Sequence, residues 1–145
     1  MKKKDTEGQL YIPSFSYCRK IAVQSNGKAK LVDVTQPYSV LSPVAVPGNF
    51  SFMVAFAIGG LVPNKDYSFD IIFADPFDNV ITRYPLKVAP IKMDSNNNGY
   101  SIQASIDFVN LILPVEGIYK TIVKYNDTVL GSFSILVHPK GIKNA

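Results

Sequence analysis

The strongest constraint on the fold is an alternation of apolar and polar side chains, with a period of two residues, along most of the chain. In residues 50–58 the bulky apolar side chains share one parity: Phe50, Phe52, Val54, Phe56 and Ile58. The same alternation marks 67–74, 100–108, 119–125 and 129–137. Successive side chains of a strand point to opposite faces, so the pattern predicts β-strands with one buried face each. Such strands are typical of antiparallel sheets that cover a core on one side.

Turn-forming residues separate these segments. Asn26-Gly27 is a strong hairpin signal, because both central positions of the turn favour positive φ. Asn126-Asp127 precedes the last alternating segment in the same way. Clusters of Pro, Asn and Asp at 63–66 and 75–79 predict further turns. Segment 35–49 contains three prolines and is predicted to be irregular or to form an edge.

Seven to nine short strands with regular turns predict an all-β fold, a single antiparallel β-sandwich of the immunoglobulin or fibronectin type. Residues 104–113 also carry apolar side chains at helical spacing, but their β-branched content and the following Pro114 favour a strand. The 145 residues suffice for one domain with a continuous core. We expect residues 9–138 to form this domain and residues 1–8 and 139–145 to be flexible tails.

The positive charge lies mostly outside the predicted domain. Of the net charge of +4, residues 1–8 contribute +1 and residues 139–145 contribute +2. Residues 9–138 carry ten basic and nine acidic residues, a net of +1. A nucleic-acid-binding domain usually has a basic stripe on its folded body, so the charge distribution argues against a nucleic-acid partner.

Cys18 is the sole cysteine, so neither an intramolecular disulfide nor a zinc site with several cysteines forms within one chain. The longest nearly apolar run, residues 53–62, is shorter than the ~18 residues of a membrane helix. The basic start at residues 2–4 leads into polar residues rather than the apolar stretch of a signal peptide. We expect a protein without a membrane span and with a cytoplasmic location.

The C-terminal third carries a pattern that resembles a known family. Residues 110–119 read N-L-I-L-P-V-E-G-I-Y, and a hairpin and Leu130-Gly131 follow. Residues 107–137 resemble short bacterial immunoglobulin-like β-sandwich proteins of unknown function. The resemblance implies the sandwich fold, with Tyr119 packed at its corner, and supplies no catalytic residue.

Asp94, Asn96, Asn98 and Gly99 form the first half of a calcium-loop pattern. Position twelve of that loop, where a bidentate Glu is required, is Ser105. Only one carboxylate is present in the loop, so we expect a polar hairpin loop and no metal ion. One or more of the residues 97–99 is expected to have positive φ.

Other candidate chemistry is sparse, and we predict no cofactor and no catalytic site. Asp75 and Asp78 form an acidic pair, but such residues beside Pro76 are typical of turns. Cys18 and His138, the only histidine, form a nucleophilic pair only if their strands adjoin. A Cys-dependent hydrolase is the enzymatic alternative, whereas a small buried cysteine is the structural one.

Aromatic residues at loops are the remaining signal of function. The candidates for contact with a partner are Tyr38, Phe77, Tyr84 and Tyr100. We therefore predict a non-catalytic interaction module that binds another protein through loops 35–49, 75–79 and 94–99, or through a strand edge. The alternative is a structural homo-oligomer or an accessory protein of a phage or mobile element.

Overall fold

The computed structural model describes residues 9–26, 29–91 and 99–140. These ranges contain nine strands and no helix, which confirms the prediction of an all-β chain with seven to nine strands. The strands are β1 (Tyr11–Asn26), β2 (Ala29–Pro37), β3 (Val40–Leu41), β4 (Gly48–Leu61), β5 (Tyr67–Ala74), β6 (Val80–Val88), β7 (Tyr100–Leu113), β8 (Gly117–Tyr125) and β9 (Thr128–Val137). No stretch in the described part of the chain forms a helix long and apolar enough to cross a membrane.

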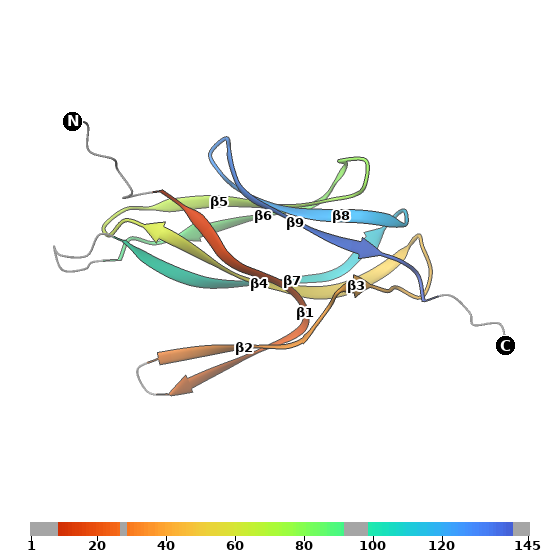
Figure 1. The fold of residues 1–145 in the computed structure, drawn as a ribbon, viewed down its shortest axis with the longest axis horizontal. Coiled ribbons are helices and arrows are strands. Elements are labelled where there is room, and N and C mark those ends of the chain that lie inside the picture. The colour runs from red at the N-terminus through yellow and green to blue at the C-terminus, as the bar shows by residue number, and fades with distance from the viewer. Residues whose placement is uncertain (1–8, 27–28, 92–98, 141–145) are drawn as a thin grey trace.

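The strands form two sheets that lie face to face (Figure 1). One sheet has the order β2-β1-β4-β7 and the other the order β3-β9-β8-β5-β6. Apart from the β1–β2 extension, this arrangement is that of an immunoglobulin-like sandwich. One pairing differs from the antiparallel expectation, because β3 runs parallel to β9.

The core lies between the two sheets and follows the alternation of the sequence. On β4 the predicted inward residues Phe52, Val54, Phe56 and Ile58 are all buried. The ring of Phe52 lies 5.2 Å from that of Phe73 on the facing sheet. Residues 104–113, which also carry helical spacing, belong to strand β7 as predicted. The period of two residues between bulky side chains therefore identifies these segments as strands and indicates which face of each strand is buried.

The predicted turns join neighbouring strands. Asn126 has φ 54° and closes the β8–β9 hairpin, in which Tyr125 pairs with Thr128. Asn64, between β4 and β5, has φ 64°. In the β1–β2 hairpin, Asn26 pairs with Ala29, so Asn26 belongs to the strand rather than to the turn centre.

Tyr119 stands at the corner of the sandwich, as the family resemblance implies. Its side chain is fully buried at the start of β8. Its hydroxyl donates to the carbonyl oxygen of Val115 at 2.6 Å and accepts from the Val115 N–H at 3.1 Å. These two bonds tie the β7–β8 connection to the core and form the tyrosine corner of immunoglobulin-like domains.

Strand β1 belongs to the sandwich for only part of its length. Its residues 11–18 pair with β4, whereas residues 18–26 pair with β2 alone. The two-stranded ribbon of residues 18–37 leaves the sandwich and extends below it in Figure 1. Because β2 leaves with the ribbon, it does not cover the first half of β1.

Candidate functional site

Two strand edges with no neighbouring strand among the described residues face the same side of the sandwich. β9 pairs with β8 along its length, but on its other side it pairs, within the described ranges, only with the two residues of β3, at Leu136 and Val137. Residues 11–17 of β1 pair with β4 and, among the described residues, with no strand on their other side. We call the surface formed by residues 11–17 and 128–134 the β1–β9 side. It exposes strand edges from both sheets next to each other.

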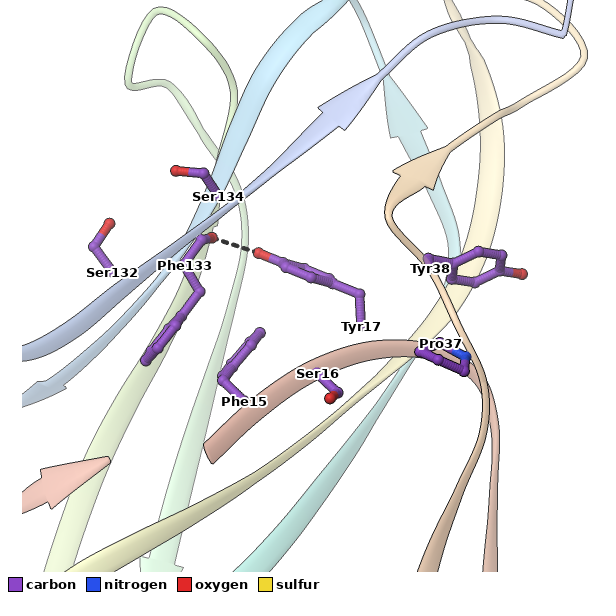
Figure 2. A pocket seen from close by; sticks show the side chains of 8 residues that line it. All are labelled: Phe15, Ser16, Tyr17, Pro37, Tyr38, Ser132, Phe133 and Ser134. Carbon is purple, nitrogen blue, oxygen red and sulfur yellow. Dashed lines mark hydrogen bonds between the residues drawn. The ribbon is translucent and has the colours of Figure 1, made fainter. Parts of the chain in front are cut away.

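A hollow of about 380 Å³ opens on the β1–β9 side (Figure 2). We call it the edge hollow, and its lining residues are Phe15, Ser16, Tyr17, Pro37, Tyr38, Ser132, Phe133 and Ser134. The rings of Phe15 and Phe133 stack with centroids 4.2 Å apart and an interplanar angle of 1°. This stack joins β1 to β9 and gives the hollow an aromatic wall.

The hydroxyl of Tyr17 connects the two sheets beneath the hollow. It donates to the carbonyl oxygen of Phe133 at 2.6 Å, as Figure 2 shows. Because a phenol has one proton, the hydroxyl of Thr121, also 2.6 Å away, donates to the Tyr17 oxygen. Burial raises the pKa of Tyr17 far above its ordinary value, although the bond with Thr121 lowers it. The Tyr17 hydroxyl beneath the hollow is therefore uncharged and is held by two hydrogen bonds.

Tyr38, in the connection between β2 and β3, forms the rim of the edge hollow. Its N–H donates to the carbonyl oxygen of Tyr17 at 2.8 Å, and its ring lies 5.8 Å from that of Phe50. The side chain is half-buried. Of the four predicted contact residues, Tyr38 alone lines this hollow.

The other long edges carry features that hinder strand addition. β6 contains Pro85, which has no N–H, between the charged residues Arg83 and Lys87. β7 is interrupted by a bulge at Asn110, which has φ 53° and donates its N–H to the hydroxyl of Ser51 at 2.8 Å. Proline, charges and bulges are the devices by which edge strands avoid new pairing. Residues 128–134 of β9 contain neither proline nor a charged residue, and they have one bulge, at Leu130, in the pairing with β8.

The remaining predicted contact residues are dispersed. Phe77 is 71% exposed in the β5–β6 loop, and Tyr84 is 44% exposed on β6. Tyr100 was expected to be exposed, but its side chain is half-buried against the core. Its hydroxyl is buried with no hydrogen-bond partner among the described residues. The reason is its position opposite Leu61 in the β4–β7 pairing, which turns the ring inward.

The three predicted binding loops do not form one surface. Loop 75–79 approaches the β7–β8 connection, since a Cβ on Gly117 would lie 2.8 Å from Pro76. The later part of segment 35–49 lies at this same end, where Lys140 N–H donates to Pro43. Segment 94–99 leads into Tyr100, at the opposite end of the sandwich. Residues 92–98 lie outside the described ranges, so the prediction about calcium and that of positive φ at Asn97 or Asn98 are untested, whereas Gly99 does not have positive φ.

Asp75 has the turn role predicted for it. Its carboxylate accepts hydrogen bonds from the N–H groups of Phe77 at 2.9 Å and Asn79 at 2.8 Å, and from the Asn79 side chain at 3.2 Å. Burial raises the pKa of Asp75, but these hydrogen bonds outweigh it and hold the pKa below its ordinary value. Asp78 forms an ion pair with Lys120 at 2.7 Å. Both carboxylates thus have structural partners.

No hydrogen bond joins the side chains of Cys18 and His138 in the described structure. Cys18 is fully buried, and burial raises the pKa of its thiol, whereas a nucleophilic cysteine needs access and a lowered pKa. The His138 Nδ1 atom instead lies 2.7 Å from a carboxylate oxygen of Glu116. In the described part of the chain, no group of three His, Cys, Asp or Glu side chains is placed to hold a metal ion.

The sequence matches no protein-family model and no curated protein. Among solved structures, an immunoglobulin-like protein from Pseudomonas aeruginosa is similar with a TM-score of 0.46 and 12% identity, over 89% of this chain and 96% of that chain. A glycosyl hydrolase family 2 member from Bacteroides cellulosilyticus is similar with a TM-score of 0.47 and 10% identity. That match covers 90% of this chain but only 15% of the hydrolase. Neither similarity is close enough to bear on function.

Proposed function

We propose that this chain is a non-catalytic interaction module that binds an extended segment of another protein along the free edge of β9. The observation that carries the proposal is the edge at residues 128–134, which contains no proline and no charged residue and adjoins an aromatic hollow. When a strand adds to a sheet edge, main-chain hydrogen bonds supply affinity and nearby pockets supply specificity. The β1–β9 side offers both kinds of contact.

The dimensions of the site fit such a partner. Residues 128–134 span roughly 20 Å in an extended strand, enough for one short partner strand. The edge hollow, at about 380 Å³, lies at the lower end of the range of small binding pockets. It would accept one or two apolar side chains of the added strand against Phe15 and Phe133.

The proposal includes a cytoplasmic setting. The single cysteine, which is buried and unpaired, fits a reducing compartment in which no disulfide is needed. Partner selection then rests on the β1–β9 side rather than on the dispersed residues Phe77, Tyr84 and Tyr100.

The test places a bulky maleimide adduct on one edge at a time. Ser134→Cys introduces an exposed thiol on β9, and Gln103→Cys introduces a matched exposed thiol on β7. The native Cys18 is buried and serves as an internal check that labelling is confined to the new site. Proteins captured from the native cell extract are identified, purified, and titrated against the unlabelled chain and both labelled chains.

We expect the adduct at position 134 to abolish binding and the adduct at position 103 to leave it unchanged. Equal binding by both labelled chains would overturn the proposal. If the captured protein is a second copy of this chain, the proposal of a different partner fails in favour of a homo-oligomer. Mixing tagged and untagged chains identifies that case.

A further inference from the structure

A second hollow adjoins the edge hollow and carries positive charge. Its volume is about 520 Å³, and we call it the cationic hollow. Its lining residues are Arg19, Gln36, Tyr38, Val40, Ser42, Phe50 and Lys140. Tyr38 lines both hollows, so they meet at its ring. The cationic hollow therefore begins where β3 replaces the open edge of β9.

The charged residues described on the wall of this hollow, Arg19 and Lys140, are both cations. No Asp or Glu is among the described residues that line it. The ion pairs observed in the described ranges join Lys120 to Asp78 and His138 to Glu116 and involve neither cation. An anionic group entering the hollow would meet two cations without displacing an ion pair formed in those ranges.

The guanidinium of Arg19 is held in place by its own chain. Its Nη1 donates to the side-chain oxygen of Gln36 at 3.0 Å. The backbone of Gln36 has φ 56°, a left-handed conformation that is unfavourable for a residue other than glycine. The main chain at Lys140 is tied down by its N–H bond to Pro43 at 2.8 Å. Because a guanidinium has five N–H donors, Arg19 retains donors for a bidentate bond to a carboxylate.

We propose that the cationic hollow binds an acidic side chain, Asp or Glu, of the extended segment that pairs with β9. This inference rests on the proposed function and adds the chemistry of the partner. A partner strand added along residues 128–134 would reach Tyr38 where β3 takes over the edge of β9. The side chain that the partner places next would then lie beside the cationic hollow. The aromatic wall of the edge hollow selects apolar side chains, and the cationic hollow selects one carboxylate at the end of the strand.

The probe is a displayed library of random twelve-residue peptides in which every peptide lies between flanking linkers. We expect the selected peptides to share an apolar extended core with an Asp or Glu at one end. Changing that acid to its amide should weaken binding by about 10-fold or more, the effect of losing a charged hydrogen bond. A synthetic peptide with an amidated C-terminus should bind as well as one with a free carboxylate, which separates a side-chain carboxylate from a terminal one.

The variant that tests the hollow is the double substitution Arg19→Gln and Lys140→Gln. It should abolish the difference between the acidic and the amide peptide. The matched control, Arg83→Gln with Lys87→Gln on β6, removes the same charge from the far edge and should preserve the difference. Both pairs are at exposed positions of the described chain, and melting curves confirm folding.

The outcomes separate the two proposals. If the adduct at Ser134 prevents the selected peptides from binding but these peptides show no preference for an acid, this inference is overturned and the proposed function stands. An acid preference that survives the Arg19 and Lys140 substitutions would do the same. Selected peptides that still bind the chain labelled at Ser134 would overturn the proposed function. Selection of no peptide would count against both.

Discussion

The hydroxyl of Tyr17 should contribute measurably to stability, because it joins β1 to the facing sheet. The substitution Tyr17→Phe keeps the ring and removes only this oxygen. The change deprives two groups of a partner: the carbonyl oxygen of Phe133 and the fully buried hydroxyl of Thr121. In the described structure the Thr121 hydroxyl has no other hydrogen-bond partner.

The magnitude follows from this geometry. A net hydrogen bond contributes about 1 kcal/mol, and leaving a buried polar group unsatisfied costs about 1–3 kcal/mol. Tyr17→Phe should therefore lower the free energy of unfolding by about 2–3 kcal/mol. Thr121→Val should cost less, because Tyr17 still donates to Phe133 after the change. The double variant should be about 1 kcal/mol more stable than the sum of the single effects, since it removes both partners of one bond.

The assay is urea unfolding monitored by circular dichroism for the wild type, both single variants and the double variant. Tyr84→Phe, which removes the hydroxyl of a partly exposed tyrosine on β6, is the matched control and should change stability little. If Tyr17→Phe matched Tyr84→Phe within experimental error, the assignment of the cross-sheet bonds would be refuted. Additive effects in the double variant would refute the pairing of Tyr17 with Thr121.

Three further predictions follow from other parts of the fold. The pKa of Asp75 is lower in the folded than in the unfolded chain, so the ionised carboxylate stabilises the fold fully at neutral pH and this stabilisation is lost as the pH falls below about 4. In Asp75→Asn the urea concentration at the unfolding midpoint should therefore fall less on acidification than it does in the wild type. An equal fall in both proteins would contradict this. Gly117→Ala should destabilise the domain by about 1–3 kcal/mol, because φ is 141° and the new Cβ would lie 2.8 Å from Pro76; thermal melting near the wild-type temperature would contradict it. Cys18 should resist alkylation in the native state and react fully in denaturant, and rapid native labelling by mass spectrometry would disprove its burial.

Local features of the fold could be predicted because they depend on short-range physics. The alternation of Phe52, Val54 and Phe56 reflects burial of one strand face, and burial is what the structure shows. The turn at Asn126 and the hydrogen-bonded loop at Asp75 depend on residues only a few positions apart. Tyr119 was recognisable from a local pattern for the same reason.

The candidate site could not be predicted, because it depends on contacts between distant parts of the chain. Tyr17 meets Thr121 and Phe133 across 104 and 116 positions of sequence. The β9 edge is open because β3 pairs with it over only two residues, and the neighbouring β1 edge is open because β2 leaves the sandwich. Strand order determines which edge stays unpaired, and alternation within a strand carries no information about its neighbours. Tyr100 illustrates the same limit, since only its pairing with Leu61 shows that its ring turns inward.

The most direct test of strand addition at β9 is amide hydrogen exchange of the chain with and without its purified partner. We expect the partner to slow exchange within residues 128–134, where the edge gains hydrogen bonds. Exchange in β6 and in loop 75–79 should not change. Protection that appears in β6 or in loop 75–79, with none in residues 128–134, would contradict the central claim.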